Sequence, residues 1–286
     1  MERKLCYHII TVIIPERFLR KKEGSMREHH ERVIQRLVER LHNDPRFPAM
    51  IIGGSVAKGW ANDNSDVDIL LVANDEEFTH RMTTKDLGYY DTEIADYPGG
   101  FVDGKIIDLS FLHDVADHGS EPARAAFLGA SVAYSRIPDL DTLVARIPTY
   151  PEQEREAKIL AFVSQLAILE WYVGEAEKRQ NLYLLSWAAN NMVLYGGRII
   201  LAHNHLLYPY HKWFLHQLGL APLKPESLLN LIDTLLQRPN TENAHVFYKS
   251  ITNYLHLEID LDQAGMNFTR NTEWNWRDGH TPLPDW

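Results

Sequence analysis

The chain has 286 residues and a formal net charge of −10, from 29 Lys and Arg against 39 Asp and Glu, and 45% of its residues are hydrophobic. This length and composition exclude a mainly disordered or collagen-like chain and allow about two globular domains. The acidic balance disfavours duplex nucleic acid as a partner, because affinity for phosphate backbones depends largely on Lys and Arg. The segment 47–150 contains 17 acidic and seven basic residues, and its net charge of −10 equals that of the whole chain.

The cellular compartment is predicted from the single cysteine and the shortness of the apolar runs. Cys6 alone cannot form an internal disulfide, which favours a reducing compartment. The apolar run over residues 6–15 is too short to span a bilayer, and no small-residue cleavage site follows it. We therefore expect a cytoplasmic protein without a membrane partner.

Residues 1–150 have the pattern of a small mixed sheet with helices. Apolar residues recur every four positions in one segment, and two short apolar runs follow it. The segments expected are a helix over 27–42, strands over 49–52 and 67–72, and helix or loop over 75–87 and 121–134. A hairpin is predicted from 101–102 and 105–112, because Asp103-Gly104 suits a two-residue turn.

Residues 151–286 have a different pattern, in which strand signals end and helical periodicity dominates. One long helix is predicted over 152–179, with a broad apolar face. Further helical patterns follow over 181–204, 212–218, 225–236 and 241–262, and the tail from Arg270 is expected to be irregular. The prediction is an α+β chain with a sheet domain over 1–150 and a helical bundle over 151–286.

The residues that indicate chemistry begin with two aspartates on the second predicted strand. Asp66 and Asp68 are two positions apart, so their side chains share one face of the strand. Two adjacent carboxylates repel each other unless a cation lies between them. Paired carboxylates on a rigid strand suit Mg²⁺, particularly when the ion also carries substrate phosphates.

A predicted phosphate-binding turn lies only ten residues before the first of these aspartates. Gly53-Gly54-Ser55 leads into a short helix, whose free N–H groups attract an anion. The Ser55 hydroxyl and the Lys58 ammonium could reach the same group. We add Ser65 and Lys212 as predicted nucleotide-binding residues.

A third carboxylate is expected if the reaction is phosphoryl or nucleotidyl transfer with two metal ions. Asp108 is the candidate, because a charged residue among the apolar residues of 105–112 needs a partner or a metal to offset its desolvation. On a strand it would share a face with Ile106 and Ser110. Asp66, Asp68 and Asp108 are thus the predicted catalytic and metal-binding residues.

Together these residues resemble the nucleotidyltransferase superfamily related to DNA polymerase β. The shared pattern is a Gly-Ser turn at 54–55, a short helix, an Asp-x-Asp strand at 66–68, and a later acid at Asp108. The Ala-Lys-Gly at 57–59 is similar to the Ala-Arg-Gly of small bacterial members that modify antibiotics. The resemblance implies that ATP or another nucleoside triphosphate is a substrate, that two Mg²⁺ ions are the cofactor, and that the catalytic domain covers about 47–115.

The second half weakly resembles the helical domains of aminoglycoside and lincosamide nucleotidyltransferases. This resemblance implies an acceptor site between sheet and bundle, with Tyr208, Tyr210 and Lys212 as candidate lining residues, and an antibiotic-resistance role. Glu170 is considered as a general base, although a solvated position is the simpler interpretation.

Two alternatives stay open, namely nucleotidylation of a protein or an RNA end, and a non-catalytic nucleotide-binding module. No spacing of histidines indicates a zinc site.

Overall fold

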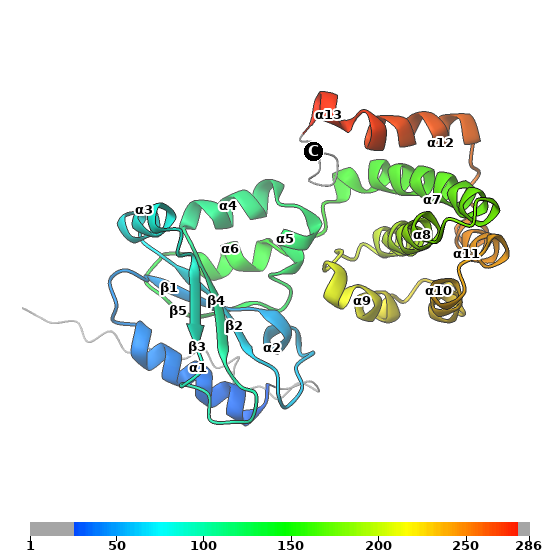
Figure 1. Cartoon of the computed structure of the whole chain (residues 1–286). Helices are drawn as coiled ribbons and strands as arrows, with labels where there is room; N and C mark the ends of the chain where they lie inside the picture. The colour runs from blue at the N-terminus through cyan, green and yellow to red at the C-terminus, as the bar shows by residue number, and fades with distance from the viewer. Residues whose placement is uncertain (1–25, 280–286) are drawn as a thin grey trace, which may run out of the picture. The chain divides into compact units, whose positions relative to one another are not determined.

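The computed structural model describes residues 26–279 and divides the chain into two compact units, residues 1–149 and 150–286. We call the first the sheet unit and the second the helical unit (Figure 1). The predictions made for residues 1–25, including Cys6, lie outside the described residues. The α+β fold class is confirmed.

The sheet unit contains a mixed five-stranded sheet in the order β3-β4-β2-β1-β5. Strands β2 and β4 are parallel, and the other neighbouring pairs are antiparallel. In chain order the elements are α1 (Glu28–Leu41), β1 (Ala49–Ile52), α2 (Gly54–Lys58), β2 (Val67–Val72), α3 (Asp75–Thr84), β3 (Gly88–Asp91), β4 (Val102–Ile107), α4 (Leu109–His118), α5 (Glu121–Ala125), β5 (Ser131–Ser135) and α6 (Leu140–Arg146).

Both faces of this sheet are covered by apolar side chains of helices. On one face Val33 and Leu37 of α1 pack in a cluster with Val67 and Ile69 of β2. On the other face Val72 packs with residues of α4 and α6. These two helices cover that side of the sheet in Figure 1. The alternation within β2 therefore directs Val67 and Ile69 towards α1 and leaves Asp68 on the opposite face.

The predicted hairpin around Asp103-Gly104 is wrong. Both residues lie inside the continuous strand β4, which pairs with β3 on one side and β2 on the other. Gly104 serves packing and makes no turn, because a Cβ there would lie 2.7 Å from a side-chain carbon of Ile69. Strands β3 and β5 were also missed; β3 is a short, half-exposed edge strand without an apolar run.

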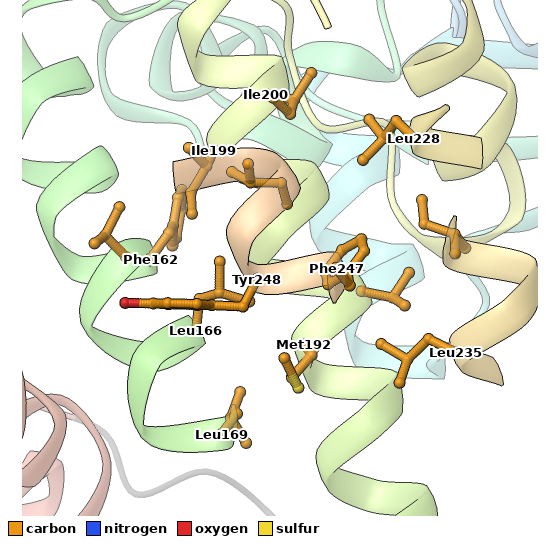
Figure 2. Close-up of a cluster of buried hydrophobic side chains, with 14 of the residues drawn as sticks. Phe162, Leu166, Leu169, Met192, Ile199, Ile200, Leu228, Leu235, Phe247 and Tyr248 are labelled. Carbon is orange, nitrogen blue, oxygen red and sulfur yellow. The ribbon is translucent and has the colours of Figure 1, made fainter. Parts of the chain in front are cut away.

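The helical unit is built around α7, which confirms the long predicted helix, and α8. Its core contains Phe162, Leu166, Met192 and Phe247 (Figure 2). The tail from Arg270 is partly helical and differs from the irregular structure predicted. The elements are η2 (Glu152–Glu154), α7 (Arg155–Lys178), α8 (Leu182–His203), η3 (His211–Trp213), α9 (Phe214–Leu220), α10 (Leu228–Gln237), α11 (Thr241–Tyr254), α12 (Leu261–Phe268), η4 (Thr269–Glu273) and α13 (Asn275–Asp278).

One described segment, Glu152–Lys178, is long and apolar enough to cross a membrane by length and composition. Half of its apolar window is buried inside the protein, and its apolar residues belong to the core of the helical unit. A single helix of this kind is weak evidence for a membrane span, because a core helix can pass the same test.

Candidate active site

The turn between β1 and α2 brings the Gly-Ser sequence against the second strand. The N–H of Gly53 donates a hydrogen bond to the carbonyl of Asp68 (N···O 3.0 Å). Gly54 has φ +63°, a conformation that favours glycine, and a Cβ at this position would overlap the Asp68 carboxyl group. Glycine at position 54 is thus required both by the backbone and by the close approach of Asp68.

Helix α2 presents its first turn beside this contact. Its N-cap residue is Gly53, and no side chain among the described residues caps the helix at this end. The first N–H groups of a helix have no acceptor within the helix, so they are available to an anion. Ser55 in this turn is buried, whereas Lys58 at the last turn is half-buried, with its Nζ 5.6 Å from the centre of the Trp60 ring.

Asp103, predicted to lie in a turn, is the carboxylate that the neighbouring strand β4 places beside β2. In the parallel ladder between β2 and β4, Asp103 is the register partner of Asp68. Adjacent strands lie about 4.8 Å apart and register partners point to the same face, so the two carboxylates are neighbours. Asp68 is half-buried and Asp103 is exposed. Asp66, two residues before Asp68, directly precedes β2 and is also half-buried.

Asp108 does not lie on a strand, and the prediction that it shares a strand face with Ile106 and Ser110 is wrong. It is the N-cap of α4, where its carboxylate accepts hydrogen bonds from the N–H of Phe111 (3.0 Å) and the hydroxyl of Ser110 (2.6 Å). It lies five positions after Asp103, which amounts to about 16 Å along a strand. Because β2 and β4 are parallel, Asp108 lies at the opposite end of the sheet from Asp66 and Asp68.

The donor set fits Mg²⁺ that arrives with a nucleotide better than an ion held by protein alone. Within residues 26–279, no group of three or more His, Cys, Asp or Glu side chains is arranged to hold a metal ion. Mg²⁺ typically takes one or two carboxylates and completes its shell with water and substrate phosphates. Asp68, which lies against Gly54 in the first turn of α2, and Asp66, two positions before it, are the residues that would supply that partial set of oxygen ligands.

The peptide that precedes Asp66 is held by aromatic side chains. The carbonyl of Ser65 accepts a hydrogen bond from the Tyr97 hydroxyl (2.7 Å) and lies 3.1 Å from Nε2 of His30. Burial lowers the pKa of His30, an effect reinforced by neighbouring His29, so the ring is neutral at pH 7 and donates through Nε2. Burial also raises the pKa of Tyr97, and the nearby charge of Asp66 adds to this effect.

The remaining predicted residues are distributed over both units. Ser65 stands beside the aspartate pair, and its hydroxyl accepts a hydrogen bond from the N–H of Asn62 (2.9 Å). Lys212 belongs to the helical unit, where its Nζ lies 5.8 Å from the centre of the Trp213 ring. In the same unit Tyr208 is buried in the core, Tyr210 is exposed, and Glu170 accepts from Nδ1 of His245 at 2.6 Å.

Comparison with known proteins identifies the class of the sheet unit. Residues 34–124 match the family model described as "Nucleotidyltransferase domain". The chain therefore contains a nucleotidyltransferase domain of the superfamily related to DNA polymerase β, and this domain runs from within α1 into α5.

A solved structure is also similar to the chain over most of its length. It is the crystal structure of a nucleotidyltransferase-like protein from Exiguobacterium sibiricum 255-15, with 13% sequence identity and a TM-score of 0.44. The match covers 89% of this chain and 83% of that one. No curated protein matches the chain.

Proposed function

We propose that the protein transfers a nucleoside monophosphate from a Mg²⁺-bound nucleoside triphosphate to an acceptor hydroxyl and releases pyrophosphate. The observation that carries this proposal is the contact between the Gly54 turn and Asp68, with Asp103 as the register partner of Asp68. This contact supports the proposal because, at one end of strands β2 and β4 in a nucleotidyltransferase domain, it brings together a turn suited to an anion and neighbouring carboxylates.

Each of these residues has a distinct role in the proposed reaction. The N–H groups at the start of α2 and the Ser55 hydroxyl bind the triphosphate and orient it. Asp66 and Asp68 hold Mg²⁺, which neutralises developing charge on the phosphates when it is bound. Asp103 takes the role predicted for Asp108, namely to help hold a second ion and to accept the proton of the attacking hydroxyl.

The bond changes follow from this arrangement. A new bond forms between the acceptor oxygen and the α-phosphorus, the bond from that phosphorus to the bridging oxygen breaks, and pyrophosphate leaves with the bonding electrons. Little covalent work falls to the protein. Positioning and electrostatic stabilisation by the residues at this edge supply most of the barrier reduction.

The acceptor we favour is a small polar molecule that carries amines, such as an aminoglycoside-like antibiotic. The support is the excess of acidic residues over 47–150, which attracts a cationic acceptor. A protein or RNA acceptor is the alternative. The third alternative, a module that binds nucleotide without catalysis, is disfavoured by the intact carboxylates at positions 66, 68 and 103.

Incubation of the protein with Mg²⁺ and each α-labelled nucleoside triphosphate tests the acceptor class. The first series contains a panel of aminoglycosides and lincosamides, and the second contains cell lysate. Label on a small molecule supports the favoured acceptor, whereas label on protein or RNA replaces it. The variant D66N/D68N is the control, because it keeps side-chain volume and removes both charges.

A further inference from the structure

One backbone carbonyl next to the proposed metal ligands receives two side-chain donors from distant parts of the sequence. The carbonyl oxygen of Ser65 lies 2.7 Å from the Tyr97 hydroxyl and 3.1 Å from Nε2 of His30. Tyr97 follows β3 in the loop towards β4, whereas His30 lies on α1. Two donors on one carbonyl fix the plane of the peptide that joins Ser65 to Asp66.

The direction of the Asp66 side chain depends on that peptide, because Asp66 lies outside the sheet ladder. Strand β2 begins at Val67, which is the register partner of Val102. The residue after Asp66 is therefore held by the sheet, and Asp66 itself is held from its N-terminal side. Without the two donors, the Ser65 carbonyl would lose both side-chain partners, and the backbone bond from the N–H of Ser65 to the carbonyl of Asn62 (3.2 Å) would hold this residue with less support.

Two features of the local structure accommodate these donors, namely a glycine beside the Tyr97 ring and a buried His30 nitrogen without a hydrogen-bond partner among the described residues. Gly100 allows the Tyr97 ring to pack against the backbone, because a Cβ there would lie 2.6 Å from the ring. His30 is fully buried, and its Nδ1 has no hydrogen-bond partner within residues 26–279. An apolar residue would fill this position without a buried unsatisfied nitrogen, so the donor at Nε2 is the property that a histidine adds.

The same end of α1 also holds the loop that precedes Ser65. The Arg27 side chain donates to the carbonyl of Ala61 and pairs with Asp63 (2.5 Å). One turn further along the helix, His30 reaches Ser65. Helix α1 thus holds the segment from Ala61 to Ser65 at several points.

We infer that His30 and Tyr97 are positioning residues, which hold the Ser65–Asp66 peptide so that the Asp66 carboxylate stays beside that of Asp68 to share a divalent cation. This inference rests on the proposed function, in which the two aspartates bind the metal. Both residues act through the backbone of Ser65.

The test is a titration of the full chain with Mn²⁺ as the probe ion in the presence of a non-hydrolysable α,β-methylene nucleoside triphosphate. Electron paramagnetic resonance measures free Mn²⁺, and a protein-free titration gives the Mn²⁺ that the nucleotide binds by itself. Tyr97→Phe keeps the ring and removes only the hydroxyl, and Tyr134→Phe is the matched control. The Tyr134 hydroxyl also donates to backbone carbonyls, those of Leu41 (3.3 Å) and Phe47 (3.2 Å), in the same unit. We expect the Kd for Mn²⁺ to rise about tenfold in Y97F, as is typical when an outer partner of a metal site is lost. In Y134F the Kd stays unchanged.

His30→Leu separates positioning from a merely structural role. This variant removes the donor to Ser65 together with the buried Nδ1, so Tm is expected to stay the same or rise while the Kd for Mn²⁺ increases. Wild-type affinity for Mn²⁺ in both Y97F and H30L would overturn the positioning role alone. If the wild-type chain binds Mn²⁺ no better than D66N/D68N, the proposed metal site fails and the positioning role fails with it.

Discussion

Asp68 and Asp103 are register partners on the parallel strands β2 and β4, so their side chains stand next to each other on one face of the sheet. Asp108 stands at the other end of the same strand pair and caps helix α4. The direction of β4 therefore determines which acid accompanies the Asp-x-Asp pair. The predicted hairpin would make Asp108 the third acid, whereas the parallel pairing of β2 and β4 places Asp103 beside Asp68.

The proposal gives Asp103, and not Asp108, the role of the third acid. It therefore predicts opposite effects of substitution at these two positions on activity and on stability. Asp103→Ala is expected to reduce nucleotidyl transfer at least about a hundredfold, because a group that acts on the reacting hydroxyl is lost. Since Asp103 is exposed, the same change should leave Tm nearly unaltered.

Asp108→Ala is the matched variant for that experiment. Loss of the N-cap of α4 is expected to reduce the free energy of unfolding by about 1 kcal/mol, while transfer stays near the wild-type rate. Initial rates of pyrophosphate release and thermal denaturation measure the two effects. Full activity in D103A with inactivity in D108A would reverse the assignment.

A second prediction concerns Gly54. Gly54→Ala places a methyl group where the Asp68 carboxyl group lies and imposes a φ of +63° on a residue with a Cβ. The positive φ alone costs about 1–2 kcal/mol, and displacement of Asp68 should abolish Mn²⁺ binding. Gly88→Ala in β3 is the control, because a Cβ there meets nothing within 4 Å. Mn²⁺ titration and thermal denaturation of both variants measure these effects. Equal Mn²⁺ affinity and equal Tm in G54A and G88A would contradict the close packing of Gly54 against Asp68.

Much of this site could be predicted from local sequence, because the information needed was local. The strands 49–52 and 67–72 were predicted with the bounds observed, since each is a short apolar run with clear ends. The Gly54 turn and the same-face pair Asp66 and Asp68 depend only on neighbouring residues and strand periodicity.

The role proposed for Asp103 could not be predicted in the same way, because the position of Asp103 beside Asp68 depends on the pairing of β4 with a strand more than 30 residues earlier. Asp103-Gly104 is a common turn pair, and only its place between β3 and β2 shows that it lies within a strand. One local signal was available, namely the alternation of apolar and polar residues over 102–106, which suits a strand with one buried face. The contacts of His30 and Tyr97 with Ser65 likewise join residues more than 30 positions apart.

A third prediction concerns the pH dependence of stability and comes from His30. Burial lowers the pKa of His30 in the folded chain from 6.5, an effect that neighbouring His29 and Arg27 increase and that Ser65 and Asp63 oppose. The unfolded chain therefore binds a proton at a higher pH than the folded chain does. This contribution to stability is present above pH 6.5 and is lost as the pH falls towards the lower folded pKa.

Hydrogen exchange of β1 and β2 amides at pH 7 and pH 5.5 would measure this effect within the sheet unit. The wild-type sheet unit should lose stability over this interval, and H30L should lose less. His203, whose pKa is also lowered by burial, belongs to the helical unit and leaves the comparison of these amides unaffected. An identical loss in H30L and wild type would show that His30 is not the group responsible.

The most direct test of the central proposal is the Mg²⁺-dependent release of pyrophosphate by the wild-type chain and by D66N/D68N, with the acceptor found in the screen. Both substitutions keep side-chain volume, so Tm should stay within about two degrees of the wild-type value. The proposal predicts one pyrophosphate released for each labelled acceptor in the wild type and none above background in the double variant. Transfer at an undiminished rate in a folded D66N/D68N variant would contradict it.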